Sequence, residues 1–343
     1  MSQHNESGHG QGQGHSHGHG HSHGHGQGHG HSHGHGQHGA DLDWEVLATH
    51  LESNAEVQLP VLRGSAARLG ELLGPEREVR RILDIGSGPG VMTSVFAEAF
   101  ADAEVVAVDG TPGLLERALA RAERLGFGGR VSARHAELPE GLTAGDGDGD
   151  GDGQGQGHGH GEGGLGTADL VWSSKVVHHL GDQQGALDAL AGVLRPGGLL
   201  AVAEGGLPMR FLPRDIGIGR PGLQARLDAA HERWFEVMRA EVPGSTAVVE
   251  DWPAMLGRAG LTRVGSFTAL LDLPAPLGES ARAFLHAHLT RLRESVGEEL
   301  DEADGRTLDV LTDPRSPEGI LRRPDAFLLS ATTVFTGVRP AVP

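Results

Sequence analysis

The sequence predicts an α/β fold, namely a doubly wound, mostly parallel seven-stranded sheet with a helical cap. Three observations predict it. Short apolar runs alternate with helix-like segments between residues 79 and 204. The first apolar run turns through three closely spaced glycines into a helix-like segment. Beyond residue 205 the alternation stops, and a mainly helical region precedes the last strands. Alternating strands and helices give a parallel sheet with helices on both faces.

The individual elements follow from hydrophobic spacing and from turn residues. The strands are expected at about 80–85, 104–108, 130–134, 169–173, 199–203, 262–271 and 327–338. The helices are expected within 44–73 with a break at Pro60, and at 91–100, 112–125, 183–194, 205–245, 251–259 and 278–325. The Pro-Gly-Gly sequence after Arg195 is a stop signal between a helix and the following strand.

Composition divides the chain into four expected regions. Residues 1–39 are rich in His and Gly and contain almost no apolar side chains, which predicts a disordered tail. Residues 40–78 are an expected N-terminal helical cap, and 79–204 an expected ligand-binding core. That core contains a low-complexity loop at 145–166. Residues 205–343 are expected to form a helical substrate cap together with the last strands of the sheet.

Charge and cysteine content exclude several classes of protein. The net charge of −18 disfavours nonspecific binding to nucleic acid. Without cysteine there are no disulfides and no thiolate metal sites. No apolar run reaches the ~18 residues of a membrane span, and the N-terminus has no apolar signal core. A cytoplasmic protein that binds neither nucleic acid nor membrane is therefore expected.

The glycine-rich turn is the most informative motif. Gly86, Ser87, Gly88 and Gly90 follow the apolar run that contains Asp84. Such a strand-to-helix turn brings backbone N–H groups close to a nucleotide-like ligand. The spacing is G-x-G-x-G, whereas the dinucleotide fingerprint is G-x-G-x-x-G. The alternative is an ordinary turn in a chain with 56 glycines.

A second acid strengthens the ligand interpretation. Asp109 ends the next strand and is followed by Gly110. It lies near the ~20-residue offset at which an acid contacts ribose hydroxyls. A carboxylate can accept two hydrogen bonds from a cis-diol. The alternative role for Asp109 is to cap the following helix.

Leu-Asp-Ile followed by G-x-G-x-G resembles motif I of the class I S-adenosylmethionine-dependent methyltransferases. Asp109, the strand ending at Trp172-Ser173 and the Arg195-Pro-Gly-Gly turn extend the resemblance over residues 79–204. The resemblance implies a Rossmann-like fold and S-adenosylmethionine as cofactor. It also implies that Glu137 contacts the adenine amino group, with a solvated loop acid as the alternative. The implied cofactor-binding residues are Asp84, Gly86, Ser87, Gly88, Gly90, Asp109, Gly110, Glu137 and Ser173.

The candidate catalytic residues are His179 and His178, which follow the fourth strand. In the family this region lies beside the methionine end of the cofactor. An acceptor oxygen or nitrogen can need a base, and His179 or His178 is the candidate. The alternative is a histidine that packs or bonds to backbone. Lys175, the only lysine in the chain, is expected to be solvated.

The expected function is methyl transfer from S-adenosylmethionine to a small-molecule acceptor at O, N or C. Phe211, Trp234 and Phe235 are candidates for the lining of the acceptor pocket. Two alternatives belong to other classes. One is an NAD-dependent oxidoreductase. The other is a His-rich metal-binding protein with a non-catalytic Rossmann-like domain.

The His-rich tail has 13 histidines within residues 1–38 and can bind Ni, Zn or Cu ions incidentally. No catalytic metal site is expected, because no preformed geometry is evident.

Deleting 1–38 and 145–164 should therefore leave the melting temperature and donor affinity nearly unchanged while removing most Ni or Zn binding. Thermal denaturation and calorimetry on the deletion variant check this. A variant that no longer binds the donor would show that the tracts belong to the fold.

Overall fold

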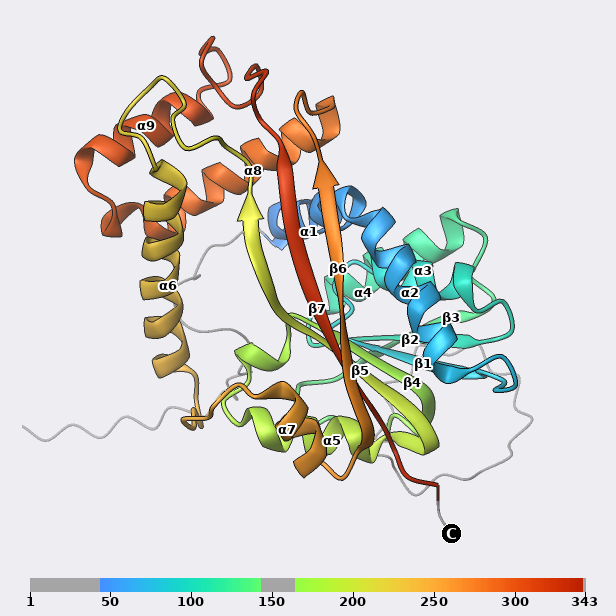
Figure 1. Ribbon diagram of the computed structural model, residues 1–343. Helices are drawn as coiled ribbons and strands as arrows, with labels where there is room; N and C mark the ends of the chain where they lie inside the picture. The colour runs from blue at the N-terminus through green and yellow to red at the C-terminus, as the bar shows by residue number, and fades with distance from the viewer. Residues whose placement is uncertain (1–43, 143–163, 342–343) are drawn as a thin grey trace, which may run out of the picture. The chain divides into compact units, whose positions relative to one another are not determined.

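The computed structural model describes residues 44–142 and 164–341 (Figure 1). The expected tail at 1–39 and nearly all of the expected loop at 145–166 lie outside the described residues. Within those described, no helix combines the length and the apolar character that crossing a membrane requires.

The described residues form one seven-stranded sheet, with the order β3-β2-β1-β4-β5-β7-β6. Neighbouring strands from β3 to β5 are parallel, whereas β7 is antiparallel to both β5 and β6. The expected mostly parallel seven-stranded sheet is thus confirmed, with the last strand inserted antiparallel. The strands are β1 (Arg81–Ile85), β2 (Glu104–Asp109), β3 (Val131–His135), β4 (Ala168–Ser174), β5 (Leu194–Arg210), β6 (Thr262–Leu273) and β7 (Leu328–Val338).

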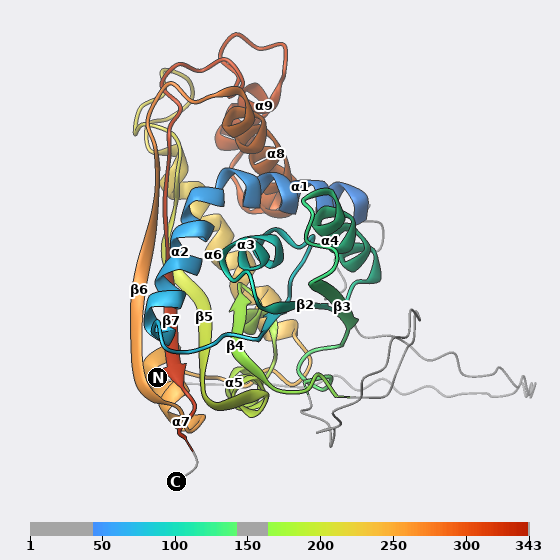
Figure 2. The same cartoon turned by 90° about the vertical axis from the view of Figure 1, so that its right-hand side faces the viewer.

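Helices cover both faces of the sheet because successive strand residues point in opposite directions. Leu83 and Ile85 of β1 face a core shared with α5 and α7. Ile82 faces a second core shared with α2 and α3. Figure 2 shows α2 and α3 on one side and α5 and α7 near the lower end. The helices of this part are α2 (Leu59–Leu73), α3 (Val91–Ala99), α4 (Pro112–Arg124), α5 (Gln183–Gly192) and α7 (Trp252–Arg258).

A separate apolar cluster joins the remaining helices to the extended ends of β5, β6 and β7. Its fully buried members include Leu285, Leu308 and Leu328. These helices lie at the upper end of β5, β6 and β7 in Figure 1. They are α6 (Leu223–Glu241), α8 (Glu279–Val296) and α9 (Glu302–Thr312). The helix α1 (Trp44–Val57) runs beside α8.

Strand β5 is longer than the sequence predicts. It begins at Leu194 and continues to Arg210, so the expectation that helix begins near residue 205 is wrong. The pairing with β7 shifts register between Ala203 and Gly206. At Gly206 (φ 117°) a Cβ would lie 2.1 Å from the carbonyl oxygen of Ala331, so only glycine lets the strand continue along β7. The helix of this region starts only at Leu223.

Candidate functional site

The glycine turn lies at the carboxyl end of β1, where the strand order reverses between β2 and β4. In open α/β sheets this switch point is where ligands bind. Gly86, Gly88 and Gly90 have φ values of 68°, 53° and 75°. A Cβ at Gly90 would lie 2.5 Å from Cβ of Ala118, whereas a Cβ at Gly88 would meet no atom within 4 Å. Gly90 thus permits close packing against α4, and Gly88 leaves free space beside its Cα.

Asp109 connects the glycine turn to the end of β2. Its Oδ2 accepts a hydrogen bond from Gly88 N at 2.9 Å, and its Oδ1 accepts one from Thr111 N at 2.9 Å. Each carboxylate oxygen has a second lone pair for another donor. The bond to Thr111 matches the helix-capping alternative in part, because Thr111 precedes the first residue of α4.

Glu137 lies beside the residue that follows Asp109. A Cβ on Gly110 would be 3.3 Å from Glu137 Oε2. Next to it, the His135 ring nitrogen Nε2 is 3.0 Å from the Gly110 carbonyl oxygen. The structure therefore brings Gly88, Asp109, Gly110 and Glu137 together along the carboxyl edge of β1, β2 and β3.

Two buried serine hydroxyls lack hydrogen-bond partners in the part of the chain that the structure describes. They belong to Ser87 in the glycine turn and Ser173 at the end of β4. Buried polar groups are normally paired, so an orphaned hydroxyl requires an explanation. A polar ligand at this edge would supply the missing partners. The free space beside Gly88, the two hydroxyls and the two acceptor carboxylates of Asp109 and Glu137 fit a nucleoside with polar substituents.

Asp84 lies beneath the glycine turn. Its side chain is buried, and Thr93 Oγ1 donates a hydrogen bond of 2.6 Å to Asp84 Oδ2. Burial raises the pKa of Asp84 to about 7, in spite of the Thr93 bond, and Asp109 adds to the rise. The structure thus gives Asp84 a contact with the first turn of α3, which orients the turn from below.

The raised pKa of Asp84 predicts a pH-dependent stability. The native state keeps the Asp84 proton up to about pH 7, whereas the unfolded chain loses it near pH 4. The contribution of Asp84 to stability is therefore greatest at low pH and is lost as the pH rises through 7. Between pH 5 and 8 the wild type should lose about 2–3 kcal/mol relative to Asp84→Asn. Urea denaturation of both proteins across this range measures the difference, and parallel pH profiles would contradict it.

His178 and Glu204 form a hydrogen-bonded pair beside the glycine turn. His178 Nδ1 lies 2.7 Å from Glu204 Oε2, and the Glu204 side chain is 3% exposed. Glu204 Oε1 also accepts bonds from the backbone N–H groups of Val176 and Val177, both at 3.0 Å. These bonds hold the carboxylate in place. A Cβ at Gly86 would lie 2.2 Å from a Val176 methyl, so this segment packs against the glycine turn.

The short 3₁₀ helix Val177–His179 carries both histidines and contacts α6. The ring of His178 lies 5.7 Å from that of Phe235 and 4.0 Å from that of His179. Arg239 of α6 donates hydrogen bonds to the carbonyls of His178 and Leu180, at 2.9 and 2.7 Å. The structure therefore brings Phe235 to His178, whereas Trp234 instead stacks on His231 within α6.

Lys175 differs in part from the expected solvated lysine. Its side chain is exposed, but surrounding protein lowers its pKa through desolvation. Its backbone has φ 56°, a left-handed conformation that costs a non-glycine residue ~1–2 kcal/mol. Its N–H bonds to the carbonyl of Ala203 on β5. Lys175 is thus held at the same edge as the two histidines.

The sequence interpretation missed Glu204. The available signal was an acid directly after the buried run Leu199 to Ala203, at the carboxyl end of a strand. An acid in that position faces either solvent or a site, and its spacing from His178 gives no indication of a pair.

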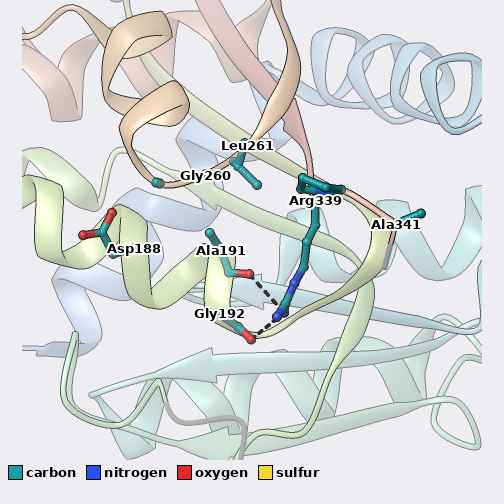
Figure 3. Close-up of a pocket in the computed structure, with 9 residues that line it drawn as sticks. Asp188, Ala191, Gly192, Gly260, Leu261, Arg339 and Ala341 are labelled. Atoms are coloured by element: carbon teal, nitrogen blue, oxygen red, sulfur yellow. Dashed lines mark hydrogen bonds between the residues drawn. The ribbon is translucent and has the colours of Figure 1, made fainter. Parts of the chain in front are cut away.

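A hollow of about 420 Å³ lies at the opposite edge of the sheet (Figure 3). Its lining includes Gly192, Leu261 and Arg339. Arg339 Nη1 donates to the carbonyl of Gly192 at 2.9 Å. No residue of the predicted site lines this hollow. In the described ranges, no group of three or more His, Cys, Asp or Glu side chains could hold a metal ion.

Comparisons with known proteins identify the family. A family model described as a methyltransferase domain matches residues 83–200. A trans-aconitate 2-methyltransferase from Methylobacterium radiotolerans is 28% identical over 266 residues, which cover 78% of this chain and 81% of that protein. The chain belongs to the class I S-adenosylmethionine-dependent methyltransferases. It is therefore an enzyme that uses S-adenosylmethionine as methyl donor, and the oxidoreductase alternative is wrong.

Further relatives have similar names. The trans-aconitate 2-methyltransferase from Methylobacterium nodulans is 26% identical, over 66% of this chain and 82% of that protein. A solved S-adenosylmethionine-dependent methyltransferase from Geobacter sulfurreducens, in complex with S-adenosylhomocysteine, is 17% identical. It aligns over 80% of this chain and 90% of that chain with a TM-score of 0.41.

Proposed function

We propose that this methyltransferase acts on an oxygen or nitrogen of a small-molecule acceptor, with His178 as the general base. The observation that carries the proposal is the His178–Glu204 pair, held at the carboxyl edge next to the glycine turn. A histidine oriented by a buried carboxylate is a common arrangement for removing a proton. The order of the candidates is thus reversed from the sequence analysis, where His179 came first.

The donor is proposed to lie across the ends of β1, β2 and β4. Gly86, Gly88 and Gly90 would let its polar chain approach the backbone. Asp109 would accept bonds from the ribose hydroxyls, and Glu137 would face the adenine amino group beyond Gly110. Ser87 and Ser173 would donate or accept through their unpaired hydroxyls. Asp84 would support the glycine turn through its hydrogen bond with Thr93.

Residues of this chain would remove the proton of the acceptor. When bound, S-adenosylmethionine supplies a methyl group already activated on a sulfonium. Glu204 accepts the Nδ1–H of His178, which leaves Nε2 as the basic nitrogen. Nε2 would take the proton of the acceptor X–H as the methyl group is transferred to X. Phe235, in contact with the ring of His178, would help to exclude water.

A small-molecule acceptor is supported by two observations. Two relatives are named for methylation of trans-aconitate. The chain has a net charge of −18, which opposes binding to nucleic acid. Residues 40–78 and 205–343 are proposed to form a cap that encloses the acceptor, with α1, α6 and α8 nearest to it. Phe211 and Phe235 would supply apolar lining within that cap.

The test uses methyl-labelled S-adenosylmethionine and a cell extract separated into fractions below and above ~1 kDa. The enzyme should transfer label to the low-mass fraction, with formation of S-adenosylhomocysteine. Heat-inactivated enzyme serves as the control. Label incorporated only into protein or nucleic acid would overturn the small-molecule acceptor.

A further inference from the structure

Five basic side chains from four segments lie together beside the proposed acceptor region. Lys175 follows β4, His50 lies on α1, His231 on α6, and His288 and Arg291 on α8. His50 stacks on Phe284 of α8 at 5.9 Å, and His288 lies 6.1 Å from the same ring. His50, His231, Arg291 and Lys175 are all close enough to His288 to affect its ionisation. We call these five residues the basic cluster.

The side chains of the basic cluster have no hydrogen bond or ion pair with any other described residue. His50 Nδ1 is buried without a partner in the same described ranges. Several other arginines of the cap are paired with acids. Arg226, for example, binds Asp304 of α9 with bonds of 2.6 and 2.9 Å. The cluster therefore concentrates unused donors in a chain that has 46 acids and 28 lysines and arginines.

Few acids compensate the basic cluster. The negative charge of Glu204 favours the charged form of Lys175. However, the Glu204 oxygens already accept hydrogen bonds from Val176, Val177 and His178. The negative charge of Glu294, on the same helix, favours the charged form of Arg291. Burial, followed by the neighbouring basic groups, lowers the pKa of His288 to about 4. Burial and Arg291 lower the pKa of His50 to about 4. Like charges thus oppose one another where no anion neutralises them.

We propose that the basic cluster binds an oxyanion group of the methyl acceptor, so that the acceptor is a small organic acid. Lys175 and Arg291 supply the positive charges, and the rings of His50, His231 and His288 supply N–H donors. The proposal rests on the proposed function, because it names the substrate class of the same site. A carboxylate and a phosphate share this chemistry, and the experiment separates them.

The surroundings of the cluster fit an organic ion. The His288 ring packs 5.8 Å from Phe211, edge to face, and 6.1 Å from Phe284. These two aromatic rings are buried and would contact the carbon part of the acceptor. Lys175 precedes Val176, whose methyl group packs on Gly86 of the glycine turn. The anion would therefore be anchored close to the donor, with the atom to be methylated directed at His178.

The test measures anion binding to the full-length protein in the presence of saturating S-adenosylhomocysteine. Citrate is the carboxylate probe and inorganic phosphate the second probe, with sodium chloride at equal ionic strength as the control. Calorimetry and thermal denaturation are recorded for the wild type, Lys175→Met and Arg291→Met. Arg124→Met is the matched control, because Arg124 is an exposed cation in the last turn of α4. Lys175→Arg retains the charge and tests rescue.

The wild type and Arg124→Met should bind at least one probe beyond the chloride effect. Lys175→Met and Arg291→Met should each lose ~10-fold or more in affinity for that probe. Their affinity for S-adenosylhomocysteine should change less than 2-fold, and Lys175→Arg should recover part of the loss. Binding of citrate alone identifies a carboxylate acceptor, and binding of phosphate alone a phosphorylated one.

Two outcomes would overturn the proposal. One is that neither probe binds the wild type above the chloride control. The other is that Lys175→Met and Arg291→Met bind the probe as the wild type does, which would place the ion elsewhere. Failure of the proposed function is distinct, because it would appear as label in macromolecules. A variant that unfolds is recognised from its melting temperature, and the other variant then decides the result.

Discussion

Replacing His178 by alanine is expected to lower kcat by ~10²–10⁴-fold, as for the loss of a general base. The reason is the bond of 2.7 Å between His178 Nδ1 and Glu204, which orients the ring and leaves Nε2 to take the proton of the acceptor. Donor affinity should be unchanged, because no described contact joins the ring of His178 to the glycine turn. Steady-state kinetics and calorimetry with S-adenosylhomocysteine provide the two measurements.

Two further variants separate a base from a structural residue. Glu204→Gln should lower kcat, because a neutral amide holds the ring of His178 less firmly than a charged carboxylate does. His179→Ala is the matched control, with an expected loss below ~10-fold, because its exposed ring is not the one bonded to Glu204. If His178→Ala loses less than ~10-fold, proximity of donor and acceptor suffices for transfer and the base role is withdrawn.

The second large effect concerns the donor. Asp109→Ala should weaken binding of S-adenosylhomocysteine by ~1.5–3 kcal/mol, or ~10–150-fold, for the loss of charge-assisted hydrogen bonds. Part of this loss in affinity would come from lost hydrogen bonds within the protein. Asp109 accepts the N–H of Gly88 and of Thr111, so its removal also loosens the glycine turn. Isothermal calorimetry at constant pH and salt measures the change.

Asp102→Ala is the control for Asp109→Ala, because Asp102 is an exposed acid in the turn before β2 and its loss changes net charge equally. Asp109→Asn retains an acceptor oxygen and should show a smaller loss than Asp109→Ala. Equal affinity of Asp109→Ala and wild type would mean that the ribose lies elsewhere, and the donor placement would have to be abandoned.

The core of the fold was predictable because its signals are local. Apolar runs of five to seven residues form the buried strands, as in β1, whose residues Ile82 to Ile85 are all buried. The G-x-G-x-G turn requires positive φ at consecutive glycines, which only glycine adopts at low cost. The sequence alone therefore predicted the parallel sheet, the turn, and the placement of Asp109 at the end of the next strand.

The end of β5 could not be predicted because its cause is not local. Residues 205–210 contain two glycines and a proline, which indicate a turn when read alone. They extend as a strand because β7, which lies far along the chain, supplies backbone partners from Leu329 to Thr332. Pairing across a sheet overrides local preference where hydrogen bonds and a covering layer are available.

The sequence by itself determined that this protein has a methyltransferase-like core with a glycine-rich turn after its first strand, because those features depend on neighbours in the chain. Only the tertiary structure decided which histidine is paired with a carboxylate. His178 and Glu204 are 26 positions apart and meet because β4 and β5 are adjacent and parallel. The basic cluster likewise exists only where α1, α6 and α8 meet the end of β4. Charge and proton transfer act over a few ångströms in space, and separation in the chain does not report that distance.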